Sequence, residues 1–251
     1  MTRIYRRRIQ IAPVGFEVDR VVLPAIREKA EKVYLMVHKD RSKDKATKYA
    51  AAIQKKLKAV NIETELVYCD WQNIEEITRV ARDLILQESS NEVAINLASG
   101  SKNHAIGLDR ACMTFRKRKH IHPFYPEAEK WTAWRYPKQQ STGVKKIKQI
   151  PIHRIIVPDP ELVIALKAIK QDAVDIPMHK GKKGVKKKDL AKSLYGDSSK
   201  VNLTRLQRNI TQKLEKTWRA IEIIQVGQSD WISLNDEGKY LRYVLKNEET
   251  Y

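Results

Sequence analysis

The chain has 251 residues, of which 42% are hydrophobic, and carries 49 Lys and Arg against 30 Asp and Glu, a formal charge of +19. That hydrophobic fraction supports a folded core and excludes a largely disordered chain. The apolar runs are far shorter than the roughly 20 residues of a membrane-spanning helix. Cys69 and Cys112 are too few for a disulfide framework or a zinc site. We expect a soluble, cytoplasmic protein without metal, cofactor or membrane partner, and the charge favours a polyanionic partner.

The positive charge is concentrated in two zones of the sequence. Residues 102–154 and residues 176–219 each carry a net charge of +10. A solvated, lysine-rich surface would give the same counts, so charge alone does not identify the partner.

The first half of the sequence alternates between strand-like and helix-like patterns. Strands are expected at residues 8–14, 32–38, 63–69 and 92–98, and helices at 18–30, 43–59, 73–87 and 104–118. This alternation with short connections is typical of a mainly parallel sheet covered by helices. Right-handed crossovers then make the domain Rossmann-like, and the fold class is α/β.

Open sheets of this kind bind ligands at the carboxyl ends of their strands, near the point where the strand order reverses. Residues 13–20 and 99–103 follow the first and fourth strands. The small residues Ser99–Ser101 allow close backbone approach, and a helix start together with Lys102 attracts an anion. The alternative is that Ser99–Ser101 only form a tight turn and that Ser101 or Asn103 caps the helix, which would require the same residue types. No GxGxxG follows the first strand and no GxxxxGK[ST] occurs, which disfavours dinucleotide and P-loop nucleotide binding.

The composition changes around residues 147–160, where three prolines bound an apolar run. We place a domain boundary there, with residues 1–154 as the first domain and 155–251 as the second. A helix is expected from Pro160 to Gln171. Residues 178–188 are basic and of low complexity, and are expected to form a mobile connection.

The rest of the second domain follows the order of a winged helix-turn-helix. Two helices are expected at residues 188–195 and 201–217, strands at 220–226 and 231–234 joined by the turn 227–230, and a closing helix at 235–245. Two helices joined by a turn, the second one basic, and followed by a hairpin are typical of DNA-binding modules.

The second helix presents arginine and asparagine opposite its apolar ridge. Arginine pairs with guanine and asparagine with adenine in the major groove, whereas lysines suit phosphates. The expected residues for binding double-stranded DNA are Lys186, Lys187, Lys188, Lys200, Asn202, Thr204, Arg205, Arg208, Asn209, Lys213, Gln228 and Ser229. An ordinary solvated helix face in a dimerisation module is the alternative.

Three groups of motifs together resemble one known family. They are RIQIAPVGFEVDRVV at residues 8–22, NLASGSK at 96–102, and the C-terminal run LAKSLYG, LTRLQRNITQKLEK and SLNDEGKYL. The chain resembles archaeal CARF–winged-helix transcriptional regulators over almost its whole length, where CARF denotes the CRISPR-associated Rossmann fold. Within NLASGSK, Ala98 and Ser99 depart from the family pattern, which usually has a hydroxyl and a glycine there.

This resemblance implies a homodimer that senses a cyclic oligoadenylate, most plausibly cyclic tetra-adenylate, in a pocket at the dimer axis. The expected ligand-binding residues are Gly15, Phe16, Glu17, Asn96, Ala98, Ser99, Gly100, Ser101, Lys102 and Asn103. The chain is then a ligand-responsive transcriptional regulator that binds DNA.

No catalytic residue is expected. The alternative is a ring nuclease that cleaves cyclic oligoadenylate, with Ser99, Ser101 and Lys102 as its candidates and the winged helix used for assembly. The basic run Arg116–His122 has the Arg–His spacing of a nuclease but is interpreted as a basic surface. His38, His153 and His179 are expected to be isolated, without partners for a triad or a metal site.

Overall fold

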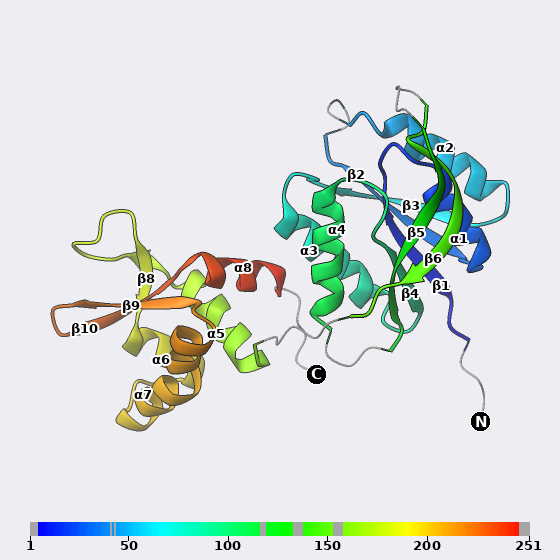
Figure 1. Ribbon diagram of the computed structural model, residues 1–251. Coiled ribbons are helices and arrows are strands. Elements are labelled where there is room, and N and C mark those ends of the chain that lie inside the picture. The colour runs from blue at the N-terminus through cyan, green and yellow to red at the C-terminus, as the bar shows by residue number, and fades with distance from the viewer. Residues whose placement is uncertain are drawn as a thin grey trace. The chain divides into compact units, whose positions relative to one another are not determined.

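The structure, a computed structural model, describes residues 5–40, 42, 44–115, 119–132, 138–152 and 158–245. The chain divides into two compact units, residues 1–156 and 157–251 (Figure 1). The boundary expected between residues 154 and 155 falls in 153–157, outside the described residues. None of the described helices is long and apolar enough to cross a membrane.

The first unit alternates strands and helices, as the sequence predicts. Its elements are β1 (Arg8–Pro13), α1 (Asp19–Arg27), β2 (Lys32–His38), α2 (Thr47–Lys58), β3 (Glu63–Cys69), α3 (Ile74–Gln87), β4 (Glu92–Asn96), α4 (Lys102–Met113), β5 (Ile121–Trp131) and β6 (Ser141–Gln149). The four expected strands and four expected helices are present, with ends that differ by a few residues.

The strands form one six-stranded sheet in the order β3-β2-β1-β4-β5-β6. Neighbouring strands are parallel except β5 and β6, which pair antiparallel. The expected mainly parallel sheet is confirmed, and β5 and β6 form an edge that the sequence analysis did not predict. Successive strands are added on one side of β1 and then on the other, so β1 and β4 are neighbours at the reversal of strand order.

Helices cover both faces of this sheet (Figure 1). On one face, α1 and α2 pack against the sheet in an apolar cluster that includes Ile53 and Leu35. On the other face, α3 and α4 pack against it in a second cluster that includes Leu108 and Ile95. Residues 32–38 are therefore buried on both sides, which explains their nearly continuous apolar sequence.

A buried ion pair joins the start of α1 to the β5–β6 edge. Nη1 of Arg20 lies 2.9 Å from Oε2 of Glu17, and the two residues are only 2% and 5% exposed. Nε of Arg20 donates to the carbonyl of Pro126 in β5, and the hydroxyl of Ser141 in β6 donates to Glu17. Because a buried charge is costly without its partner, this pair fixes the loop after β1 against β5 and β6.

The second unit combines helices with a small antiparallel sheet. Its elements are α5 (Pro160–Gln171), β7 (Val174–Asp175), β8 (Lys183–Lys186), α6 (Lys187–Tyr195), α7 (Lys200–Leu206), π-helical turns at Gln207–Thr211 and Lys213–Thr217, β9 (Ile221–Val226), β10 (Ser229–Leu234) and α8 (Asp236–Val244). The strand order is β7-β8-β10-β9.

Two features of this unit differ from the sequence-based expectations. The segment 178–188, expected to be a mobile connection, contains β8, which pairs with β10 through Val185 and Ile232. Gly184 makes this pairing close, because a Cβ there would lie 2.7 Å from the carbonyl oxygen of Ile232. The helix expected at 201–217 is α-helical only to Leu206 and continues in π-helical turns.

Candidate functional site

The loops that follow β1 and β4 touch each other at the carboxyl edge of the sheet. A Cβ atom on Gly15 would lie 2.7 Å from the backbone nitrogen of Gly100, so the two backbones are in direct contact. Gly100 also has φ +81°, a conformation that side chains other than that of glycine rarely adopt. The two loops that the sequence places at the switch point therefore form one surface.

Helix α4 begins at this surface with a side-chain cap. The hydroxyl oxygen of Ser101 accepts a hydrogen bond from the backbone N–H of His104 at 3.3 Å and lies 3.0 Å from Nδ1 of that residue. The backbone N–H of Ser101 donates to the same Nδ1 at 3.2 Å. Lys102, the first residue of α4, is exposed. The cap and an anion site are compatible, because the cap uses the N–H of His104 and leaves the lysine facing solvent.

The four helices of this unit offer different environments to an anion at their starts. Gln139 occupies the start of α1, where its Oε1 accepts from two backbone N–H groups at 3.0 and 3.2 Å. A carboxylate oxygen of Asp44 accepts the N–H just before α2, and the first turn of α3 carries Glu75 and Glu76. Both α2 and α4 have a lysine and no carboxylate in the first turn, but at α2 the carboxylate of Asp44 already lies against the N–H just before the helix. A phosphate therefore fits α4 best.

Several of the expected ligand residues make contacts that hold the loops in place. Asn96 is fully buried; its Nδ2 donates to the carbonyl of Arg20 at 2.8 Å, and its Oδ1 accepts from the N–H of Ala98 at 3.0 Å. The carboxylate of Glu17 is directed at Arg20 and Ser141, as described above. The ring of Phe16 lies 5.5 Å from that of Tyr49.

Two buried polar atoms near the start of α4 have no hydrogen-bond partner among the described residues. They are the hydroxyl of Ser99, which is 1% exposed, and Nε2 of His104, which is 4% exposed. Because Nδ1 of His104 accepts from Ser101, the proton of the neutral ring lies on Nε2. Buried polar groups are rarely left unsatisfied, so such atoms beside a helix start point to a ligand or to ordered water.

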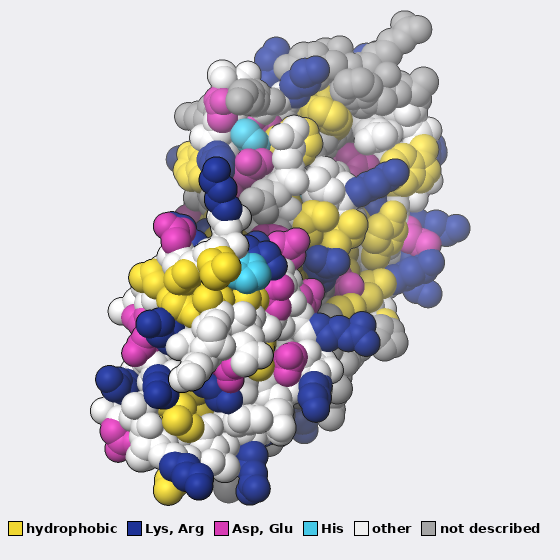
Figure 2. Space-filling model, turned by 90° about the vertical axis from the view of Figure 1, so that its left-hand side faces the viewer, with side chains coloured by type: hydrophobic (Ala, Val, Ile, Leu, Met, Phe, Trp, Pro, Cys, Tyr) yellow, Lys and Arg dark blue, Asp and Glu magenta, His cyan; other side chains and the backbone are white. Residues whose placement is uncertain are grey.

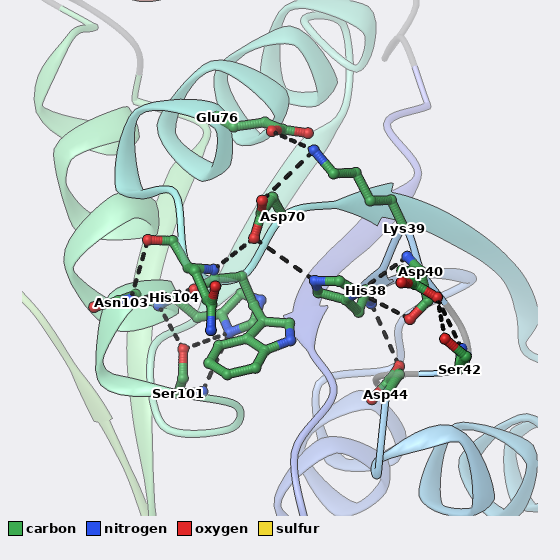
Figure 3. Close-up of polar contacts among 12 residues, drawn as sticks. His38, Lys39, Asp40, Ser42, Asp44, Asp70, Glu76, Ser101, Asn103 and His104 are labelled. Atoms are coloured by element: carbon green, nitrogen blue, oxygen red, sulfur yellow. Dashed lines mark hydrogen bonds and ion pairs between the residues drawn. The ribbon is translucent and has the colours of Figure 1, made fainter.

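The same edge holds residues from β2 and β3 that the sequence analysis did not assign to a site (Figure 3). His38, expected to be isolated, has its Nε2 3.6 Å from Oδ1 of Asp70. Its ring lies 5.8 Å from that of Trp71, and Nδ2 of Asn103 donates to the carbonyl of Trp71 at 3.2 Å. Their positions in the sequence could have indicated this neighbourhood, because His38, Asp70 and Trp71 lie at or just beyond the ends of strands that share this edge.

The basic run Arg116–His122 is described only in part, because residues 116–118 lie outside the described residues, as does His153. Nε2 of His122 lies 2.8 Å from a carboxylate oxygen of Glu92. Among the described residues, no group of three or more His, Cys, Asp or Glu is arranged to hold a metal ion.

In the second unit, nine of the twelve expected DNA-binding residues line two hollows. The first has a volume of about 270 Å³ and is formed by the starts of α6 and α7 and the β9–β10 turn. Seven of the expected residues line it: Lys186, Lys187, Lys188, Lys200, Thr204, Gln228 and Ser229. Figure 2 shows one face of the molecule, on which Lys and Arg side chains are dispersed among acidic ones. The lining of this hollow itself has four lysines and one carboxylate, that of Asp230.

Two lysines of this hollow are already in contact with other side chains. Nζ of Lys187 lies 2.9 Å from Oε1 of Gln207 and 3.5 Å from a carboxylate oxygen of Asp230. Nζ of Lys186 lies 5.3 Å from the ring centre of Trp231. Lys187 therefore connects the long helix, which is α7 with its π-helical continuation to Thr217, to the hairpin of β9 and β10. This is a structural role in addition to any contact with phosphate.

The second hollow, of about 560 Å³, lies between α5, α6 and α7 and includes Asn202 and Arg205. The guanidinium of Arg205 lies 4.7 Å from the ring centre of Tyr195. Arg208, Asn209 and Lys213 are exposed farther along the helix. The expected base-reading residues are thus on the surface, with Arg205 held in place by an aromatic ring.

Comparison with known proteins gives a partial family match. Residues 8–131 match the family model described as "HFX_2341_N:-like, N-terminal". A search of curated proteins finds the Uncharacterized protein MJ1513 of Methanocaldococcus jannaschii, 28% identical over 188 residues. The match covers 65% of this chain and 56% of that protein, so the chain spans little more than half of its relative.

Solved structures with a distant likeness include three from bacteria. Can2 from Sulfobacillus thermosulfidooxidans in complex with cyclic tetra-adenylate has 9% identity and a TM-score of 0.42, over 92% of this chain and 77% of that one. Enterococcus italicus Csm6 bound to cyclic hexa-2'-fluoro-hexa-dAMP has 12% identity and a TM-score of 0.40, over 48% and 33%. Protein VC1899 from Vibrio cholerae has 13% identity and a TM-score of 0.41, over 94% and 65%.

Burial lowers the pKa of His104 from 6.5 to about 4, with a smaller contribution from His38. The unfolded chain takes up a proton at this histidine below about pH 6.5, and the folded chain does so only near pH 4. The free energy of unfolding should therefore fall by about 3 kcal/mol from this group as the pH drops from 6.5 to 4. Urea unfolding of wild type and His104→Gln between pH 4 and 7 tests this. Equal slopes in the two proteins would contradict it.

Proposed function

We propose that the chain is a ligand-responsive DNA-binding regulator whose first unit binds a cyclic oligoadenylate, with cyclic tetra-adenylate as the preferred ring. The observation that carries this proposal is the start of α4 at the switch point, where Lys102 faces solvent and the buried hydroxyl of Ser99 has no hydrogen-bond partner in the described part of the chain. Fixed backbone dipoles, a lysine and hydroxyls are the groups that bind phosphate.

The geometry favours a phosphate-rich ligand over an ordinary dinucleotide. In dinucleotide-binding folds the pyrophosphate lies at the helix that follows the first strand. Here Gln139 fills the start of that helix, and the anion site lies instead at the helix after β4. The choice of a cyclic oligoadenylate comes from the resemblance of the motifs at residues 8–22 and 96–102 to CARF regulators.

We propose that two copies of the chain share the ligand. A ring of four 3′–5′ linked adenylates can have two-fold symmetry, so a symmetric dimer would present Lys102 and its neighbours twice to a ligand with four negative charges. A dimer also suits the DNA, because operators are usually read as paired half-sites.

We propose that the second unit is a winged helix that binds double-stranded DNA. The order α6, α7, β9, β10 places a hairpin directly after the long helix. Seven of the expected residues line the hollow of about 270 Å³ that is formed by the starts of α6 and α7 and the β9–β10 turn. Lys188 and Lys200 are exposed in this hollow and are the proposed phosphate contacts. Arg205 and Arg208 are the proposed base-reading residues.

Binding without cleavage fits the site better than a ring nuclease does. The hydroxyl of Ser101 is used in capping α4, and His104 is buried with a pKa of about 4, so it holds no extra proton at neutral pH to donate to a leaving group. Incubation with cyclic tetra-adenylate should therefore return the intact ring. Linear products on chromatography would instead support the ring nuclease.

The ligand site predicts a graded response to charge at Lys102. Lys102→Ala should weaken binding of cyclic tetra-adenylate about tenfold or more, because a charged hydrogen bond to phosphate is lost. Lys102→Glu should weaken it further by repulsion. Calorimetric titration with cyclic tri-, tetra- and hexa-adenylate is the measurement, and Lys145→Glu, an exposed lysine of β6, is the control. Unchanged affinity in Lys102→Glu would move the site elsewhere, and no binding of any ring by wild type would remove the ligand proposal.

For the proposed DNA site, we expect some substitutions to reduce sequence preference and others to reduce the affinity for all DNA. Arg205→Ala and Arg208→Ala should reduce the preference for a selected duplex over a scrambled one, by about 1–3 kcal/mol for each lost base contact. Lys188→Ala and Lys200→Ala should weaken both duplexes alike and lower the salt dependence. Fluorescence anisotropy at two or more salt concentrations measures both, with Lys170→Ala on α5 as the control. If all four variants changed both duplexes in the same ratio, the assignment of the helix face would be wrong.

A further inference from the structure

The carboxyl edge of the sheet carries an aromatic side chain that the packing of the core does not use. Trp71 lies two residues beyond the end of β3 and is partly exposed. Neither apolar cluster of the first unit, as far as the described residues show, includes it. Its ring meets that of His38 at an interplanar angle of 63° and 5.8 Å between centres, a T-shaped contact in which one neighbouring ring covers at most one face of the indole.

The loop that carries Trp71 is fastened to the start of α4. Nδ2 of Asn103 donates to the carbonyl of Trp71 at 3.2 Å, and Oδ1 of Asp70 accepts from the N–H of Gln72 at 2.9 Å. Asn103 is the residue after Lys102, so the loop that carries Trp71 is held beside the proposed phosphate site. A fixed loop presents its aromatic side chain with little further loss of conformational freedom on binding.

The chemistry of an oligonucleotide supplies the partner for this ring. Each phosphate of such a ligand is linked through a ribose to a base, so a site that holds the phosphate needs a nearby surface for the base. Aromatic side chains serve this purpose by stacking, because every base has a flat π-face. A structural alternative is that Trp71 only shields the His38–Asp70 contact from water.

We propose that Trp71 is the stacking surface for an adenine base of the nucleotide whose phosphate lies at the start of α4. The proposal rests on the proposed ligand function and adds a subsite at the ends of β2 and β3, away from the Gly15–Gly100 contact. It assigns the phosphate to Lys102 and residues 99–101, and the base to Trp71.

The two parts of this site respond differently to salt. Removing a phosphate contact lowers the salt dependence of binding, whereas removing a stacking contact lowers affinity and leaves the salt dependence unchanged. Trp71→Leu removes the aromatic face, and Trp71→Phe keeps a smaller one. Tyr68→Leu is the matched control, because Tyr68 is exposed on β3 and its position next to the inward-facing Cys69 places it on the opposite face of that strand.

The experiment is calorimetric titration of the full chain with cyclic tetra-adenylate at two salt concentrations, with thermal unfolding of every variant. We expect Trp71→Leu to lose about tenfold to hundredfold in affinity with an unchanged salt dependence, and Trp71→Phe and Tyr68→Leu to stay close to wild type. Trp71→Phe also tests the fold, because it keeps the ring beside His38. If wild type and Trp71→Leu bind equally while Lys102→Glu is impaired, the stacking proposal alone is overturned. If wild type itself does not bind, the ligand function fails and the proposal with it.

Discussion

The contact between the backbones of Gly15 and Gly100 is the constraint on which the first unit's site depends. It can form because β1 and β4 are adjacent in the sheet, although about 80 residues separate them in the chain. A side chain at either glycine would force the loops apart, by collision with the other backbone at Gly15 and with Pro13 and His104 at Gly100. Close contact brings the start of α4 against the loop after β1, and so determines where an anion can bind.

The same loops show how one fold can favour one anion site over another. The buried Arg20–Glu17 pair and the side chain of Gln139 tie the start of α1 to β5, β6 and the segment that connects them. These contacts occupy the start of α1, which is the helix start that dinucleotide-binding proteins use for the pyrophosphate. The start of α4, with Lys102, is then the better place for an anion. In the second unit, Lys187 of α6 similarly contacts both Gln207, in the π-helical continuation of α7, and Asp230 of β10, and so joins these three elements.

The sequence predicts the parts of this structure that depend on local pattern. Residues 32–38 indicate a strand buried on both faces, and the small residues before Lys102 indicate a helix start at a strand end. The β5–β6 edge was missed because Pro123, Pro126 and many lysines obscure the strand pattern, and its stability comes from pairing with β4 and contact with α1. The neighbourhood of His38, Asp70 and Trp71 was missed because strand order, rather than spacing in the chain, brings them together.

Hydrogen exchange can show where on the first unit the ligand binds, because it locates a ligand without a mutation. With cyclic tetra-adenylate present, we expect slower exchange of the backbone amides in residues 14–18, 71–73 and 99–104 than in the free protein. The amides in the middle of α2, on the other side of the sheet from α4, should exchange at the same rate in both states. Unchanged exchange in the three edge segments, with binding established by calorimetry, would contradict the claim that the ligand lies where the loops of β1 and β4 meet.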